Sequence, residues 1–218
     1  MHSAGSASKI KLNSFDDLFG VSDAEQIIQV EVTELYPFKN HPFRVLDDKK
    51  MEEPVESSQK YGVLVPILIR QRAEGGYEII AGHRRKRGAE RAGLHCLPAI
   101  IRNYTDDEAT IIMVDSNIQR EDILPSEKAK AYSMKYEAMK HQGRKGGGST
   151  LDEVGEAAGE SGKTVQRYIW LARLTEPLLE MIDTKRLGIS QGADISFLPT
   201  EQQLWVQKIL QEAKITIS

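Results

Sequence analysis

Short apolar runs rich in β-branched residues mark the first half of the chain and have the length of β-strands. They lie at residues 27–32, 66–70, 77–81 and 98–102. Between the second and third runs, residues 74–76 read Glu-Gly-Gly and predict a hairpin turn. Helical spacing appears at residues 47–61, where Pro54 predicts a kink or a restart, and in a basic stretch at residues 84–92.

The second half of the chain has helical spacing almost throughout. Residues 105–108 read Thr-Asp-Asp-Glu and predict a capping box, and a proline at position 125 predicts the start of the next helix. Apolar helix faces predict that Trp170 and Trp205 are buried. Further helices are predicted at residues 151–158, 163–174, 176–187 and 200–213. We therefore expect an α+β fold, a small α/β domain followed by an all-α domain.

This change of pattern divides the chain into three parts. Residues 1–25 are mostly small and polar, and we expect a flexible N-terminal arm. Residues 26–115 are predicted to form the α/β domain, and residues 116–218 the helical domain. A chain of 218 residues is long enough for two such domains.

Composition excludes several classes of protein. The chain has 29 lysines and arginines against 32 aspartates and glutamates, a net charge of -3, so it does not hold nucleic acid by bulk charge. A single cysteine, Cys96, excludes an internal disulfide and a multi-cysteine zinc site. No apolar run approaches the roughly 20 residues of a membrane span, so we expect a cytoplasmic protein without a membrane partner.

Residues 151–174 have the spacing of a helix-turn-helix. Gly155 would allow two helices to cross closely, Gly159 would supply a left-handed turn, and Val165 would anchor the second helix. Glu160 departs from the pattern, because this turn position is usually apolar. An ordinary αα-hairpin is the alternative.

The exposed face of the second helix would then meet DNA. Its hydroxyl, amide and guanidinium groups can reach base edges and phosphates in a major groove. Ser161 would also cap the helix. The candidate DNA-binding residues are Ser161, Lys163, Thr164, Gln166, Arg167 and Arg173.

A glycine and several arginines directly follow the strand at residues 77–81. A helix that starts there offers free backbone N–H groups and a favourable dipole to a phosphate, and arginines bind phosphate oxygens bidentately. A solvated basic helix face is the alternative. Residues 115–120 form a second polar cluster, and spacing alone leaves open whether it meets the first cluster or Arg44.

Three segments, residues 62–69, 77–85 and 117–129, are followed by the helix-turn-helix. Their order and spacing resemble the ParB family of chromosome and plasmid partition proteins, over residues 32–210. The resemblance implies an N-terminal domain that binds CTP and a homodimer that reads a palindromic centromere-like site on double-stranded DNA. It also implies a ParA-type ATPase as partner and a nucleoid- or plasmid-associated location.

The resemblance carries a set of nucleotide-binding residues onto this chain. They are Arg44, Gly62, Gly82, His83, Arg84, Arg85, Asn117, Gln119 and Arg120. His83 and Ser116 replace the family's two metal-associated carboxylates. Since magnesium prefers charged oxygen ligands, we expect CTP as the ligand, without efficient magnesium-dependent hydrolysis and with binding itself in question. Asp115 and Glu121 are the nearby acids that could compensate.

The leading interpretation is a sequence-specific DNA-binding protein of the partition type. The alternatives are a transcriptional repressor of a mobile element, which would use the same helix-turn-helix, and a ParB-type CTPase or nuclease. A nuclease needs clustered carboxylates to hold metal, whereas the motifs here are arginine-rich. We predict no catalytic residue and no metal ligand.

Overall fold

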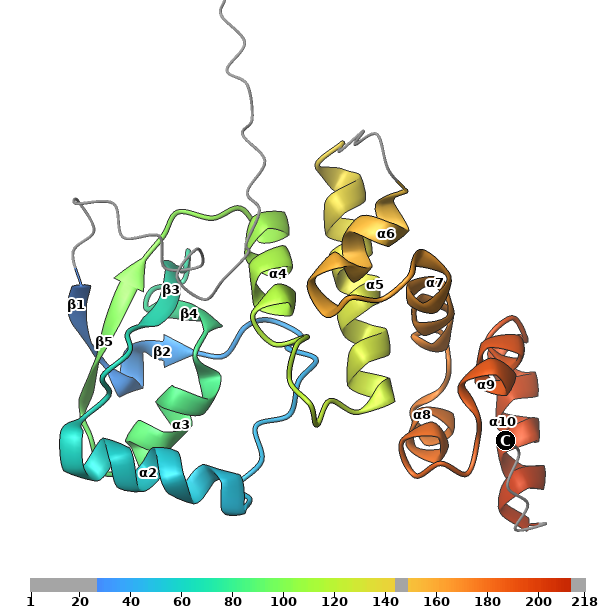
Figure 1. Cartoon of the computed structure of the whole chain (residues 1–218), viewed down its shortest axis with the longest axis horizontal. Helices are drawn as coiled ribbons and strands as arrows, with labels where there is room; N and C mark the ends of the chain where they lie inside the picture. The colour runs from blue at the N-terminus through green and yellow to red at the C-terminus, as the bar shows by residue number, and fades with distance from the viewer. Residues whose placement is uncertain (1–26, 144–148, 213–218) are drawn as a thin grey trace, which may run out of the picture.

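A five-stranded mixed sheet forms the N-terminal part of the protein in this computed structural model, which describes residues 27–143 and 149–212. The strands are β1 (Ile27–Glu31), β2 (Leu35–Tyr36), β3 (Ile67–Gln71), β4 (Tyr77–Ala81) and β5 (Cys96–Ile101). Their spatial order is β1-β5-β3-β4-β2 (Figure 1). The β3–β4 pair is antiparallel, which confirms the predicted hairpin, and β5 lies parallel to β3. The predicted N-terminal arm at residues 1–25 lies outside the described residues.

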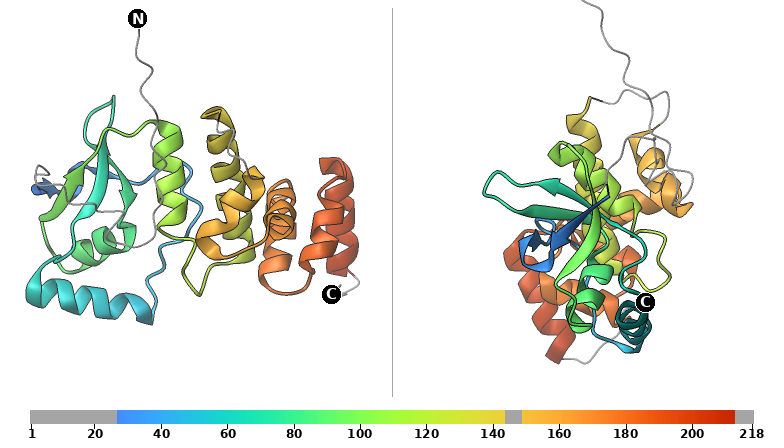
Figure 2. Two further views of the ribbon diagram at one scale, coloured as in Figure 1. Left: turned by 45° about the horizontal axis from the view of Figure 1, so that its top comes forward. Right: turned by 90° about the vertical axis from the view of Figure 1, so that its left-hand side faces the viewer.

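Two helices pack against each other beside the sheet, α2 (Lys49–Tyr61) and α3 (His83–Arg91) (Figure 2). A 3-10 turn, η1 (Val32–Glu34), joins β1 to β2. α2 continues through Pro54 as one helix, so the predicted restart does not occur.

α4 (Asp106–Asp115) packs against β4 and begins at the predicted capping box. The Thr105 hydroxyl accepts the N–H of Glu108 at 3.3 Å, and the Glu108 carboxylate accepts the N–H of Thr105 at 2.9 Å. Two backbone donors at the helix start, the N–H groups of Thr105 and Glu108, are therefore satisfied within one turn.

The C-terminal part is helical. Its elements are α5 (Pro125–His141), α6 (Thr150–Gly155), η2 (Glu156–Ala158), α7 (Gly162–Leu171), α8 (Glu176–Asp183), α9 (Ile189–Ile195) and α10 (Thr200–Glu212). The sequence did not predict α9, which is short and contains Gly192. An added Cβ at that glycine would lie 2.7 Å from Cδ1 of Ile182, so neighbouring side chains would have to shift. Among the described residues, no helix is both long enough and apolar enough to cross a membrane.

The two tryptophans differ in burial. Trp170 is half-buried, and its ring meets the ring of Phe197 edge-on at 5.1 Å between centroids. Trp205 is 73% exposed, so the prediction that it is buried is wrong. α10 packs through Gln203 and Leu210, which lie on the opposite side of the helix from Trp205.

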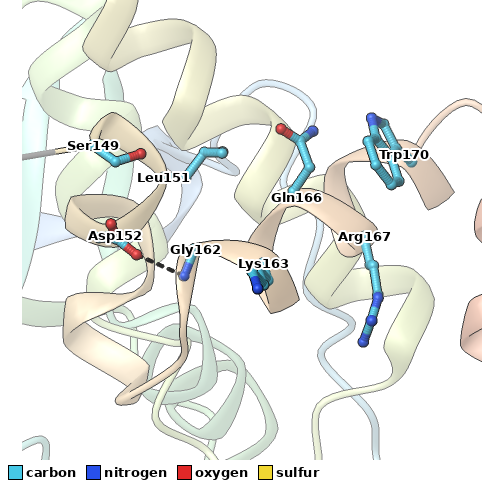
Figure 3. A pocket seen from close by; sticks show the side chains of 8 residues that line it. All are labelled: Ser149, Leu151, Asp152, Gly162, Lys163, Gln166, Arg167 and Trp170. Atoms are coloured by element: carbon cyan, nitrogen blue, oxygen red, sulfur yellow. Dashed lines mark hydrogen bonds between the residues drawn. The ribbon is translucent and has the colours of Figure 1, made fainter.

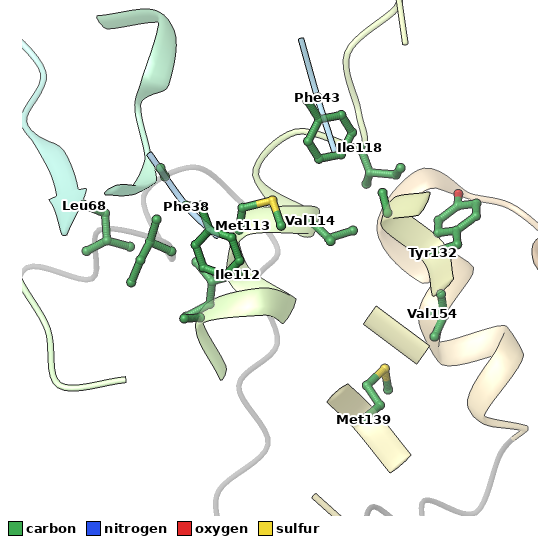
Figure 4. Close-up of a cluster of buried hydrophobic side chains, with 14 of the residues drawn as sticks. Phe38, Phe43, Leu68, Ile112, Met113, Val114, Ile118, Tyr132, Met139 and Val154 are labelled. Carbon is green, nitrogen blue, oxygen red and sulfur yellow. The ribbon is translucent and has the colours of Figure 1, made fainter. Parts of the chain in front are cut away.

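One hydrophobic core joins the sheet to the helical part (Figure 4). It begins at Leu68 on β3, passes through Met113 on α4 and Tyr132 on α5, and reaches Val154 and Val165 in α6 and α7. The core thus contains residues from both sides of residue 115, and the division into two domains at that point stays a prediction.

Candidate functional site

α6 continues directly into η2, and the chain then turns into α7. α6 and α7 cross closely at Gly155. A Cβ at this position would collide with the carbonyl oxygen of Glu160 and would lie 2.9 Å from Cγ2 of Val165. Val165 is fully buried, as expected of an anchor. Gly159 adopts the left-handed conformation, with φ 66° and ψ 26°, and turns the chain into α7.

Glu160, the unexpected acid in this turn, is held by α5. The ammonium group of Lys128 forms an ion pair with its carboxylate, and the Tyr132 hydroxyl donates to Oε2 at 3.0 Å. Burial and the Glu160 charge raise the pKa of Tyr132 well above its usual range. The acidic side chain is tolerated because α5 supplies both a cation and a donor.

An open hollow of about 520 Å³ lies along the start of α7 (Figure 3). It is lined by Ser149, Leu151, Asp152, Gly162, Lys163, Gln166, Arg167 and Trp170. Lys163 and Arg167 are exposed, and Gln166 is half-buried. We call this feature the α7 hollow. It gathers an ammonium, an amide and a guanidinium on one face of a short helix.

The remaining candidates for DNA contact are placed differently. Ser161 caps α7, because its hydroxyl accepts the N–H of Thr164 at 3.3 Å and lies 3.1 Å from the Thr164 hydroxyl. Arg173 lies beyond the end of α7, with its guanidinium 5.7 Å from the ring centroid of Phe197. Asp152, not identified from the sequence, accepts the N–H of Gly162 at 2.8 Å and fixes the first turn of α7.

A second polar cluster surrounds the start of α3. Gly82 is its N-cap with φ 110°, and an added Cβ would lie 2.6 Å from Cγ2 of Ile67, so only glycine fits. Arg84 donates from Nη2 to the carbonyl of Lys50 at 2.9 Å. Arg85 donates from Nη1 to the carbonyls of Val65, at 3.0 Å, and Pro66. Burial lowers the pKa of Arg85 to about 10.

His83 is a neutral acceptor in this cluster. Its Nε2 accepts the backbone N–H of Phe38 at 3.3 Å, and its ring lies 3.9 Å from the ring of His41 between centroids. Burial, with smaller contributions from His41 and Lys86, lowers the pKa of His83 to about 3. His41 donates from Nδ1 to the carbonyl of Phe43 at 2.7 Å, and burial lowers the pKa of His41 as well.

The segment after α4 approaches this cluster at two points. After burial, the positive charge of Arg120 contributes to lowering the pKa of His41, whose ring lies 3.9 Å from that of His83 between centroids. Lys50, whose carbonyl accepts from Arg84, also forms an ion pair with Asp122 at 2.8 Å. The fold therefore brings one residue of the second polar cluster, Arg120, toward the α3 cluster. His41 and Lys50 make the connection, and no sequence signal pointed to either.

Other residues of the predicted nucleotide set face elsewhere. Asn117 donates to the carbonyl of Met113 at 2.9 Å. Gln119 donates to the carbonyl of Ala157 in η2 at 3.0 Å, so it contacts the turn before α7. Arg44 is exposed, and its backbone N–H is bound by the carboxylate of Glu127. Gly62 ends α2 with φ 72°.

The residues at the family's metal positions do not fit magnesium. His83 already accepts a hydrogen bond, and the Ser116 hydroxyl donates to the carbonyl of Met113 at 3.0 Å. Asp115 does not compensate, because its carboxylate forms a buried ion pair with Lys135 at 2.5 Å. Within residues 27–143 and 149–212, no three His, Cys, Asp or Glu side chains are grouped as metal ligands.

Residues 20–118 match the family model of the ParB N-terminal domain. A probable chromosome-partitioning protein ParB of Vibrio cholerae is 30% identical over 192 residues, which cover 88% of this chain and 63% of that protein. The nucleoid occlusion protein of Halalkalibacterium halodurans is 29% identical over 208 residues, 91% of this chain and 70% of that protein. The chain thus spans less than two thirds of the length of the V. cholerae relative.

The fold is similar to solved ParB structures. A C-terminally truncated ParB from Caulobacter crescentus, complexed to the centromeric parS site, matches with a TM-score of 0.52 and 24% identity, over 86% of this chain and 93% of that one. The same protein complexed with CTP-gamma-S matches with a TM-score of 0.41 and 24% identity, over 85% and 99%, too low a similarity to place a nucleotide here. The mixed α/β N-terminal part followed by helices confirms the predicted fold class. Residues 20–118 therefore match a ParB N-terminal domain, and the chain is similar to ParB proteins over most of its length.

Proposed function

We propose that this chain is a sequence-specific DNA-binding protein of the partition type, which reads a palindromic centromere-like site as a homodimer. The observation that carries the proposal is the α7 hollow, where Lys163, Gln166 and Arg167 project from a helix that follows a glycine turn. The parS complex of the C. crescentus relative, of the same fold, supports this reading.

The chemistry of the three side chains suits a major groove. An arginine can bind guanine bidentately, a glutamine can do the same with adenine, and a lysine can bind a phosphate. Ser161 caps α7 by accepting the N–H of Thr164, and it thereby fixes the start of the helix. Specificity would thus come from Gln166 and Arg167, and orientation from the remaining contacts.

Selection from a randomised duplex DNA library, followed by fluorescence anisotropy on the selected site, tests the proposal. Arg167→Ala should weaken binding to that site by about 1–3 kcal/mol and relax the base preference at one position in each half-site. Lys60→Ala, which removes an exposed positive charge from α2, is the matched control. It should change neither the affinity for the selected site nor the base preference. An Arg167→Ala protein with unchanged preference would exclude α7 as the reading helix.

The cluster at the start of α3 supports a second activity, the binding of CTP without efficient magnesium-dependent hydrolysis. Gly82, Arg84 and Arg85 provide a helix start and two guanidinium groups, while the nearby side chains do not fit a divalent cation. Calorimetry with CTP should give the same affinity in magnesium and in EDTA, and phosphate release should stay at the background rate. Magnesium-dependent turnover would contradict this proposal.

A ParA-type ATPase is the partner that goes with a partition role. A transcriptional repressor of a mobile element would use the same α7 face without that partner. The V. cholerae relative is a probable chromosome-partitioning protein and the H. halodurans relative is a nucleoid occlusion protein, so similar chains have more than one role. A pull-down with the ParA-type protein encoded nearest to this chain separates the partition role from the repressor role.

A further inference from the structure

Pro54 leaves one carbonyl of α2 without its helical hydrogen bond. In an α-helix the N–H of residue 54 would donate to the carbonyl of residue 50, and proline has no N–H. The ring of a proline also crowds the carbonyl four residues earlier and pushes it outward. The carbonyl oxygen of Lys50 therefore needs a partner from outside α2.

Arg84 is that partner. Its Nη2 atom donates to the Lys50 carbonyl at 2.9 Å, across 34 residues of sequence. Among the described residues, the Arg84 side chain makes this one hydrogen bond. A guanidinium has five N–H donors. One donor thus anchors the group, and the others remain available to an oxyanion.

α3 is built to bring Arg84 to this carbonyl. Gly88, one turn further along α3, faces Pro54, since an added Cβ would lie 3.5 Å from Cβ of the proline. Arg87 of the same helix pairs with Asp47 just before α2, with Nε 3.0 Å from Oδ1. The helices therefore meet at Gly88 and Pro54, and both arginines bind residues that precede the proline.

We propose that Pro54 is a positioning residue, which orders the Arg84 guanidinium for a triphosphate by giving it the Lys50 carbonyl as an anchor. This inference rests on the proposed nucleotide site at the start of α3. An arginine loses side-chain entropy when it binds a phosphate, and a guanidinium already held in place loses less. Pro54 thus raises the affinity of the nucleotide site without touching the ligand.

A double-mutant cycle on the unfolding equilibrium tests the anchor without any nucleotide. In the otherwise native chain, Arg84→Ala should lower the ratio of folded to unfolded protein about fivefold, the effect of one hydrogen bond. In the Pro54→Ala background, the N–H of the new alanine donates to the carbonyl of Lys50. Arg84→Ala should then lower the ratio of folded to unfolded protein by less than about twofold. Additive effects would overturn the proposal.

Calorimetry with CTP and with inorganic triphosphate tests the consequence for binding. Pro54→Ala should weaken both ligands about three- to tenfold and yet raise the midpoint of thermal unfolding, because alanine is the better helix former. A residue that was merely structural would move stability and affinity in the same direction. Ser57→Ala, an exposed neutral change on the same helix, should leave both affinities unchanged.

Equal affinities of the native chain and Pro54→Ala would overturn the proposal. If the native chain binds neither ligand, the nucleotide site itself fails, and with it the role of Pro54 in binding. The double-mutant cycle would still decide whether Pro54 provides the anchor for Arg84.

Discussion

The imidazole of His83 lies between the backbone N–H of Phe38 and the ring of His41. From the sequence, His83 is a poor substitute for a metal-binding carboxylate. In the structure it holds the loop after β2 through the hydrogen bond from Phe38. A neutral ring is required for this bond, because Nε2 must keep its lone pair.

Acid should therefore destabilise the protein through His83. Its pKa is about 3 in the folded state and 6.5 when unperturbed, so the unfolded chain binds the proton more tightly. The stability present at pH 7 is lost as the pH falls through 6.5 toward 3. Between pH 7 and pH 5 we expect a loss of about 2 kcal/mol in the free energy of unfolding, measured by urea denaturation.

His83→Gln is the control for this pH dependence. The amide oxygen can accept the N–H of Phe38 but does not titrate, so the difference between pH 7 and pH 5 should shrink by about the same amount. An unchanged difference would assign the acid sensitivity to other groups, of which His41 is the nearest.

At the scale of elements, α6 and α7 depend on one close backbone approach. Gly155 faces the carbonyl of Glu160 and the side chain of Val165, and both lie too near for a methyl group. The crossing in turn sets the direction of α7 and so the orientation of Lys163 and Arg167. A change at Gly155 should therefore affect stability and DNA binding together.

Gly155→Ala should lower the free energy of unfolding by about 1–3 kcal/mol, the usual effect of overpacking. Gly88→Ala provides the comparison, since its methyl group would meet Pro54 at an ordinary contact distance of 3.5 Å and should cost little. Urea denaturation of the two variants measures both effects. Equal stabilities would mean that the crossing can relax without loss.

On the scale of the whole molecule, polar contacts of Lys135 and Gln119 accompany the shared hydrophobic core. Lys135 of α5 is almost fully buried and joins Asp115 at the end of α4 to the carbonyl of Val154 in α6, at 2.5 and 3.2 Å. Gln119 reaches the carbonyl of Ala157 in η2. The segment after α4, which approaches the α3 cluster, is therefore connected to the turn before α7.

Lys135→Met should destabilise the protein by about 3–5 kcal/mol, because it removes one partner of a buried ion pair and the hydrogen bond to the carbonyl of Val154. Lys140→Met on the same helix is the matched control. Lys140 pairs with Glu137 at the surface, where about half of each side chain is exposed, and its loss should cost under about 1 kcal/mol. If both variants lose a similar free energy of unfolding in urea denaturation, the buried ion pair contributes no more to stability than the surface pair.

Much of the secondary structure is predictable, because its signals lie within a few residues of each other. The capping box at Thr105 and the β3–β4 hairpin are confirmed on this basis. α9 was missed because its glycines and polar residues carry no helical period. Trp205 was placed wrongly, since an apolar pattern marks a helix face but does not say which neighbour covers it.

The sequence by itself determined the resemblance to the ParB family, the fold class and the glycines of the helix-turn-helix, because periodicity, caps and turns are local. The tertiary structure decided what the charged groups do. Arg84 meets the carbonyl of Lys50 across 34 residues, and Glu160 meets Lys128 across 32. Partners so far apart in the chain are brought together only by the packing of helices that local patterns do not encode.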